Sequence, residues 1–192
     1  MTTMPSTRDR IDAAALRLFS EKGVSEVSVR DLAAATGMSE GGLYRHFTSK
    51  EELAARVFAQ AYRDIAARME RAIAGAAPRF AARARAVVDT IYEAFDSDSV
   101  LLRFLLLRQH DALPRVEATA DTPMAVVLRL VITGQNEGAV EKSLPATAAA
   151  AAFVGLVLEP LTFRVYGAIT ETARARVDTT TQLLLKALAP SA

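Results

Sequence analysis

The side chains best suited to chemistry gather in one short stretch, between positions 39 and 50. Tyr44, Arg45 and His46 follow two consecutive glycines there, and Lys50 closes the stretch. Hydroxyl, guanidinium, imidazole and ammonium groups all donate hydrogen bonds to anions, and such groups supply most contacts to the phosphates of a nucleic acid. The stretch therefore favours contact with a polyanion.

Catalysis is less well supported. His46 and His110 are the only histidines in the chain, and cysteine is absent. Neither a His-Glu-x-x-His nor a Gly-x-Ser-x-Gly motif occurs, and no glycine loop suited to phosphate is found. His110 and Asp111 are adjacent, and adjacent residues of a helix point apart. An all-α enzyme and a helical scaffold that binds only protein remain as alternatives, and neither a metal nor a cofactor is expected.

Two short helices must position this stretch. Ser28 and Asp31 have the Ser-x-x-Asp spacing of a capping box, which predicts a helix to about position 35. Gly37 then suits a tight turn, and Ser39 opens a second helix that should end near Phe47. Apolar residues can lock the crossing of the two helices: Leu32, Ala33, Met38 and Leu43. This pattern predicts a helix-turn-helix, whose second helix would present Glu40, Gly41, Gly42, Tyr44, Arg45 and His46 outward.

The rest of the chain also reads as helical. Alanine, leucine and arginine dominate, 51% of the residues are hydrophobic, and strand-like alternation is missing, so we predict an all-α fold. The net charge of +1 does not by itself indicate a nucleic-acid partner, so any basic surface must be local. We expect a long helix at 49–74, opened by a Ser-x-x-Glu box, and further helices at 79–95, 100–110, 122–136, 146–166 and 171–189.

The stretch from Val29 to Leu53 resembles the DNA-binding signature of the TetR family of transcriptional regulators. The most specific part is Gly…Leu-Tyr-x-His-Phe-x-x-Lys-x-x-Leu, and the likeness covers roughly residues 8–57. It implies a helix-turn-helix DNA-binding domain at 1–53 and a helical regulatory and dimerisation domain at 54–192. It also implies a homodimer on a near-palindromic double-stranded operator, and a repressor released by an unknown small-molecule effector.

The resemblance also suggests roles for individual residues. Arg30, Tyr44, His46 and Lys50 match positions that touch the DNA backbone in the family. Ser39, which opens the same helix, is also expected to bind DNA. The positions that vary with the base sequence read by each member are Glu40, Gly41, Gly42 and Arg45. Two alternatives stay open for the paired glycines, because they either allow close approach to DNA or form a weak turn that the fold tolerates.

The last two long helices are candidates for the homodimer interface. Ala151 and Gly155 lie in a run of small residues that permits close helix approach, and the last helix has an apolar stripe that includes Val177, Leu184 and Leu188. The same residues would serve equally well in the core of one protomer.

The middle helices are candidates for an effector pocket. Tyr92 and Phe95 share a helical face, as do Phe104 and Arg108. Arg129 and Glu159 are isolated charges in apolar surroundings, so we expect them to pair with each other or with a ligand. For any single residue of this set, the alternative is an ordinary core or surface position.

The sequence carries no sign of export. The first ten residues contain two arginines and no apolar stretch, and the longest uncharged run, at 143–158, is too short to span a membrane. A chain that folds without cysteine needs no oxidising compartment. We therefore expect a soluble cytoplasmic protein without a membrane partner.

Overall fold

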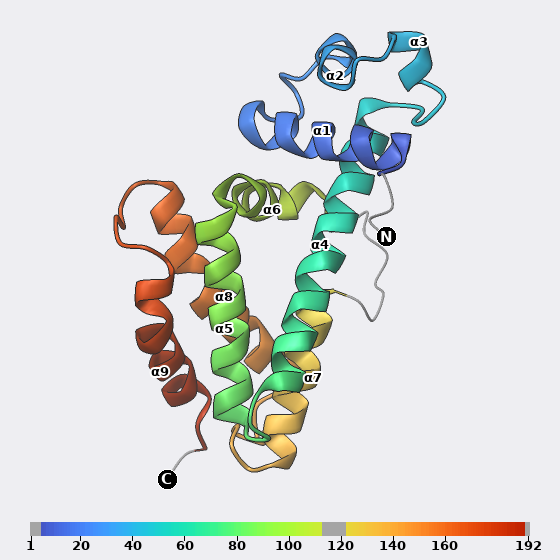
Figure 1. Cartoon of the computed structure of the whole chain (residues 1–192). Coiled ribbons are helices and arrows are strands. Elements are labelled where there is room, and N and C mark those ends of the chain that lie inside the picture. Colours follow the sequence, from blue (N-terminus) through green and yellow to red (C-terminus); the bar gives the residue numbers. More distant parts are fainter. Residues whose placement is uncertain (1–4, 113–121, 191–192) are drawn as a thin grey trace. The chain divides into compact units, whose positions relative to one another are not determined.

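The computed structural model describes residues 5–112 and 122–190, and within them every regular element is a helix (Figure 1). The chain divides into two compact units. The amino-terminal unit takes in residues 1–61 and 100–117, and the carboxyl-terminal unit takes in 62–99 and 118–192. The all-α prediction is therefore confirmed for the described residues.

The amino-terminal unit is built on a small three-helix core. Its elements are α1 (Thr7–Lys22), α2 (Val29–Thr36), α3 (Glu40–Leu43), the first part of α4 (Lys50–Gly75) and α6 (Ser99–Ala112). Helix α2 packs against both α1 and α3. The largest fully buried side chains include Ile11, Phe19, Leu32, Leu43, Leu53 and Phe58. Phe58 also meets Phe104 of α6 edge to face, with 6.0 Å between the ring centroids.

Local capping sets where these helices begin. The Ser28 hydroxyl accepts from the Asp31 N–H (3.2 Å), and the Asp31 carboxylate accepts from the Ser28 N–H (2.8 Å), so the predicted capping box is confirmed. At the start of α4 the Ser49 hydroxyl accepts from the Glu52 N–H as expected. The Glu52 carboxylate, however, accepts from the N–H and hydroxyl of Thr48, both at 2.6 Å, which differs from the predicted box.

The carboxyl-terminal unit contains four helices that pack in a closed ring. They are α5 (Phe80–Ser97), α7 (Pro123–Asn136), α8 (Ala146–Val165) and α9 (Val177–Leu188). Helix α5 contacts α7 and α9, and α8 contacts the same two helices. The short 3-10 helix η2 (Arg174–Arg176) leads into α9, and the second part of α4 adds the buried side chains Ile65, Ala66 and Met69. This ring buries most of the unit's apolar residues.

Gly134 of α7 packs against Phe80 at the start of α5. A β-carbon at this position would lie 2.6 Å from Cδ2 of Phe80 and 2.7 Å from Cγ2 of Val140, so any side chain here would displace these neighbours. Glu137, one turn further along, accepts from the Phe80 N–H (3.1 Å) and pairs with Arg83 (2.9 Å). The ring of Phe80 therefore occupies the space that the glycine leaves.

By length and composition alone, α8 could cross a membrane, which the sequence reading did not anticipate. Core helices of soluble proteins pass the same test. Phe153, Val157 and Leu161 of α8 are buried, and the helix packs against α7 and α9. Its opposite side, which includes Ala151 and Gly155, is exposed. Helix α8 is thus one member of the four-helix ring with one open face.

Two helix boundaries differ clearly from those predicted. Helix α3 ends at Leu43 and not near Phe47, because the His46 N–H turns back to the Leu43 carbonyl (2.8 Å) in a tighter bend. The last helix begins at Val177 and not at 171. There, the N–H groups of Ala173 and Arg174 donate to the Asp96 carboxylate, each at 3.0 Å, and are held outside the helix.

Candidate nucleic-acid interface

The turn between α2 and α3 fixes the second helix of the motif. Gly37 adopts a left-handed conformation (φ 68°), and the Met38 N–H bonds back to the Ala33 carbonyl (3.1 Å). Leu32 and Leu43 are fully buried on either side of the turn. The predicted helix-turn-helix is therefore present, and its locking residues lie where the sequence placed them.

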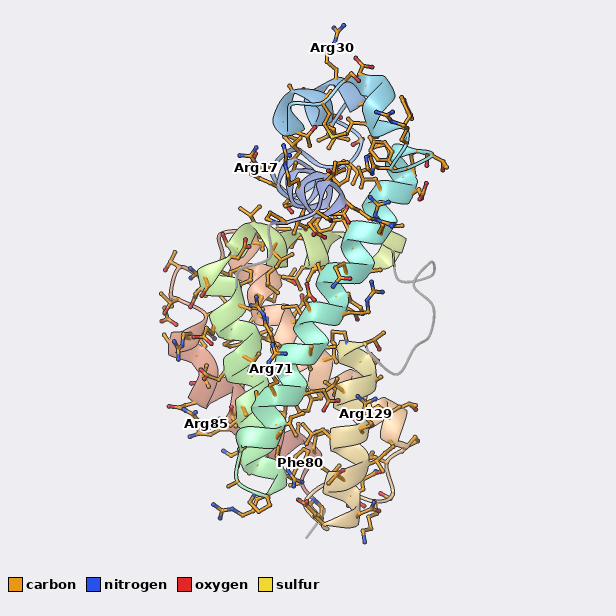
Figure 2. The ribbon with its side chains drawn as sticks, turned by 45° about the vertical axis from the view of Figure 1, so that its right-hand side comes forward. Arg17, Arg30, Arg71, Phe80, Arg85 and Arg129 are labelled. Carbon is orange, nitrogen blue, oxygen red and sulfur yellow. The ribbon has the colours of Figure 1, made fainter. Side chains whose placement is uncertain are left out.

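Arg30 and Glu40 lie at the exposed start of the two helices. The side chain of Arg30 is 89% exposed and projects away from the unit (Figure 2), and its Nε lies 3.7 Å from the Glu40 carboxylate. An ion pair this exposed contributes little to stability. Both charges are therefore available to an external partner.

The turn after α3 presents Tyr44, Arg45 and His46. Tyr44 is 53% exposed, and its ring leans against the buried Phe47 with 5.9 Å between centroids. Arg45 is exposed and His46 is half-buried. Tyr44 is thus an exposed side chain whose ring packs on a buried neighbour.

Lys50 stands at the first position of α4. Its ammonium group donates to the Ser25 carbonyl (3.1 Å), which belongs to the segment before α2. This bond holds a cation at a helix start, where the helix dipole favours negative charge. The backbone N–H groups and the lysine at this end both suit an anion.

The two consecutive glycines have different environments. Gly41 is exposed, and a β-carbon there would meet open space. Gly42 is buried, its N–H donates to the Ser39 hydroxyl (3.1 Å), and a β-carbon would lie 3.1 Å from the same oxygen. The prediction that Gly42 faces outward is therefore wrong, because it packs under the cap that Ser39 provides. Gly41 keeps its predicted outward position.

Three further residues fix the loop between α3 and α4, and the sequence reading missed them. Arg56 of α4 binds the Asp12 carboxylate of α1 through Nη2 (2.7 Å) and Nε (3.4 Å). Its Nη1 donates to the His46 carbonyl (2.9 Å), and Glu52 lies 4.0 Å away. The sequence contained one signal for Arg56. It lies between Leu53 and Val57, which are apolar and one turn apart, so an arginine here is expected at the edge of the buried helix face.

The predicted effector residues are divided between the two units. Tyr92 and Phe95 are buried in the carboxyl-terminal unit, where the Tyr92 hydroxyl bonds the Thr180 hydroxyl (3.0 Å) and Arg164 lies over the Phe95 ring at 5.8 Å. Phe104 belongs to the amino-terminal unit. The side chain of Arg108 lies outside the described residues.

The predicted charges on α7 and α8 also have other surroundings. Arg129 pairs with Glu70 of α4, and both side chains are half exposed, so the expectation of a buried charge is wrong. Glu159 is exposed on α8. The partner of Arg129 is therefore Glu70, in the second part of α4, and not Glu159 of α8.

The predicted dimer residues divide into two groups. Ala151 and Gly155 are exposed, as an interface needs. Val177, Leu184 and Leu188 are at most 4% exposed and pack within the protomer, so they have no surface to offer to a partner. The stripe on α9 therefore faces the core, and it is Leu183 (55% exposed) that points outward.

Residues 11–57 match the family described as bacterial regulatory proteins, tetR family. The HTH-type transcriptional repressor KstR2 of Rhodococcus jostii is 36% identical over 87 residues, which are 45% of this chain and 42% of that protein. The HTH-type transcriptional regulator AcrR of Shigella flexneri is 42% identical over 52 residues, 27% of this chain and 24% of that protein. The chain thus matches less than half of the length of these curated relatives.

Solved structures match over nearly the whole chain. The fatty acid degradation regulator FadR of Bacillus halodurans has a TM-score of 0.84 at 20% identity, and covers 96% of this chain and 97% of its own. FadR of Bacillus subtilis, solved in complex with stearoyl-CoA, has a TM-score of 0.83 at 18% identity, and covers 93% and 98%. At this level of identity the likeness concerns the fold.

Fold and motif together define an all-helical protein with an amino-terminal helix-turn-helix. The helix-turn-helix segment, residues 11–57, matches the tetR family of bacterial regulatory proteins, and the described part of the chain shares the fold of the solved structures named above.

Proposed function

We propose that this protein is a cytoplasmic, DNA-binding transcriptional regulator that represses its target genes. The observation that carries the proposal is a group of donors on the helix-turn-helix, in which Arg30, Tyr44 and Arg45 are exposed and His46 and Lys50 are half-buried. Backbone contacts come from Arg30, Tyr44, His46 and Lys50, while Glu40, Gly41 and Arg45 face the bases. Helices of this kind meet base edges through their amino-terminal residues.

The test is selection of DNA by the purified full-length chain. Sheared DNA from the source genome is bound, washed and sequenced, and we expect enrichment of a short near-palindromic site. Tyr44→Phe removes one hydroxyl that donates to phosphate and should weaken binding to the enriched site. Absence of enrichment over total DNA would reject the DNA-binding function and would favour a helical scaffold that binds only protein.

We further propose a homodimer that is formed through the open faces of α8 and α9. The exposed residues of these faces include small or apolar ones: Ala151, Ala152, Gly155, Phe163, Tyr166 and Leu183. Two copies of the helix-turn-helix would read two half-sites, and this repeated reading multiplies discrimination between sequences.

Gly155 tests the dimer directly. A β-carbon at this position meets open space within the protomer, so Gly155→Phe should leave the fold intact and block close approach of a second copy. Gly155→Ala is the matched control and should remain a dimer. Analytical ultracentrifugation distinguishes these outcomes, and a Gly155→Phe protein that sediments as the parent dimer would remove this residue from the interface.

We also propose that a small-molecule effector binds the carboxyl-terminal unit and lowers DNA affinity. Helix α4 begins at Lys50 beside the DNA-contact residues, and its second part pairs with α7 through Glu70 and Arg129. A ligand that displaces α7 would pull on α4 through this pair. Arg129→Ala should therefore reduce the response to effector and leave the DNA affinity of the free protein unchanged.

Linkage makes the effector measurable from either side. A ligand that lowers DNA affinity tenfold must have its own affinity lowered tenfold by DNA, which is a coupling of about 1.4 kcal/mol. Stearoyl-CoA is the first probe, because the FadR structure of Bacillus subtilis holds it. If the ligand-bound and free proteins hold DNA equally well, the regulatory part of the proposal fails.

A further inference from the structure

Arg56 bonds to Asp12 and to the His46 carbonyl and lies 4.0 Å from Glu52, yet it is not among the residues to which a DNA contact is assigned above. Its side chain is only 17% exposed, and that of Asp12 is 26% exposed. Three of its nitrogens donate to groups on α1 and on the loop before α4. A guanidinium with three bonded nitrogens directs its donors at groups of the unit itself.

The bond to the His46 carbonyl fixes one end of the loop that follows α3. The His46 N–H is already bonded to the Leu43 carbonyl (2.8 Å), and the His46 carbonyl accepts from Arg56 (2.9 Å). Both backbone polar groups of His46 are therefore satisfied by groups within the unit. With the next side chain, Phe47, buried at 3% exposure, the direction of the chain at this point is set.

The other end of the loop is fixed by Glu52. Its carboxylate accepts from the N–H and the hydroxyl of Thr48, and it lies 4.0 Å from Arg56 on the same side of α4. The Thr48 hydroxyl first, then the Thr48 N–H, and to a smaller degree Arg56 lower the pKa of Glu52. Glu52 therefore remains charged and keeps its bonds at neutral pH.

We propose that Arg56, supported by Asp12 and Glu52, is a positioning residue for DNA recognition. It holds the loop at residues 44–48 in the shape that presents Tyr44, Arg45 and His46, and it makes no DNA contact itself. This inference rests on the proposed function and goes beyond it, because it assigns the positioning of the DNA-contact residues to side chains that do not themselves touch DNA. Without this support, the loop would have to be ordered on binding, at a cost in affinity.

Arginine is required at this position for a geometric reason. Its planar fork reaches the two Asp12 oxygens and the His46 carbonyl at the same time, whereas a lysine ammonium is a single point of charge. Arg56→Lys keeps the net charge and therefore the general attraction to DNA. We expect it to weaken binding about tenfold, the factor that accompanies the loss of one charged hydrogen bond.

Asp12→Asn changes DNA affinity in opposite directions according to whether net charge or the positioning of Arg56 controls binding. Removal of a negative charge should strengthen binding to a polyanion if only charge matters. The positioning role predicts weaker binding, because Arg56 loses its charged partner. Arg17→Lys and Glu21→Gln are matched controls, since both parent residues are exposed positions on α1 and the changes in charge are the same.

The experiment measures binding of the full-length variants to a duplex that the parent selects from a random-sequence library, over a series of salt concentrations. Arg56→Lys and Asp12→Asn should both bind about tenfold more weakly at every salt concentration, with the parent's slope of log affinity against log salt. Arg56→Gln, which removes the positive charge, should keep the parent's slope as well. A slope reduced by about one unit for Arg56→Gln would instead show direct contact with phosphate and overturn the proposal.

Amide hydrogen exchange in the free protein gives a second readout that needs no DNA. The His46 and Thr48 amides should exchange faster in both variants, while amides at the centres of α1 and α2 keep the parent rates. Unchanged exchange in the loop, or equally faster exchange throughout the unit, would overturn the positioning role. If the parent selects no duplex, the proposed function fails, and the exchange result still decides whether Arg56 holds the loop.

Discussion

The pair formed by Tyr92 and Thr180 gives a prediction whose size follows from the structure. Both side chains are at most 4% exposed, and their hydroxyls meet at 3.0 Å between α5 and α9. Tyr92→Phe leaves the Thr180 hydroxyl buried without this partner, and Thr180→Val does the same to Tyr92. Each change should lower the free energy of unfolding by about 1–3 kcal/mol, because an unsatisfied buried group bears its full desolvation cost.

The double variant separates this bond from a general loss of packing. With both hydroxyls removed no polar group is left unpaired, so Tyr92→Phe with Thr180→Val should cost clearly less than the two single changes added together. Urea unfolding at one fixed protein concentration measures all four proteins, because the stability of a dimer depends on concentration. Single variants as stable as the parent, or costs that add fully, would refute the reasoning.

Alkaline pH gives the same pair a second test. Burial raises the pKa of Tyr92, with the Thr180 bond acting in the opposite direction. The unfolded chain therefore releases this proton at a lower pH than the folded protein does. The stabilisation is complete below the ordinary tyrosine pKa and is lost as pH rises from there towards the raised pKa. Tyr92→Phe should show a smaller loss of stability over this range.

Three other predictions follow from single sites. Gly134→Ala should lower the free energy of unfolding by about 1–3 kcal/mol, because its β-carbon would meet Phe80 and Val140. Gly155→Ala is the control, since its β-carbon meets open space and should not destabilise the protomer. Urea unfolding compares the two variants. The Ser28 hydroxyl first, and then its N–H, lower the pKa of Asp31, so this carboxylate stabilises the fold above its ordinary pKa and the effect is lost as pH falls through the lower folded value. Asp31→Asn should flatten that acid dependence in thermal unfolding, and an unchanged profile would contradict it. Glu40→Gln should move the preference at one base pair from cytosine towards adenine, because a carboxylate accepts from the cytosine amino group and an amide pairs with adenine. Selection of duplexes from a random-sequence library measures this preference, and an unchanged preference would contradict the prediction.

Local chemistry made much of the fold predictable. The capping box of Ser28 and Asp31 and the turn at Gly37 depend on residues at most five positions apart, and the structure confirms them. Thr122 likewise accepts from the Ala125 N–H (3.2 Å) ahead of the helix that Pro123 opens. Signals of this kind carry their partners within the same stretch of sequence.

The errors came from partners that lie far apart in the chain. Asp96 binds the backbone 77 and 78 positions later and delays the start of α9. Arg129 pairs with Glu70, which lies 59 positions earlier in the chain. The side of α9 that faces the core, with Leu184 inward and Leu183 outward, depends on how it packs against α5 and α8. Apolar periodicity locates such a stripe but does not identify its partner.

The candidate site shows the same division. The residues at its surface were predicted because the motif carries them in one run, from Glu40 to Lys50. The support behind them joins Asp12 to Arg56, 44 positions apart, and no local pattern connects the two. Gly42 was misplaced for a simpler reason, because consecutive residues of a helix cannot all face one side.

The most direct test of DNA binding through this surface is the salt dependence of affinity for the parent and for Lys50→Ala. We predict that log affinity falls linearly with log salt, by about 0.9 for each phosphate that the protein neutralises. Lys50→Ala should weaken binding to the selected duplex and to a mixed-sequence duplex by similar factors, and should flatten the slope by about one unit. An affinity that does not respond to salt, or a Lys50→Ala protein with the parent's slope and affinity, would contradict the proposed interface.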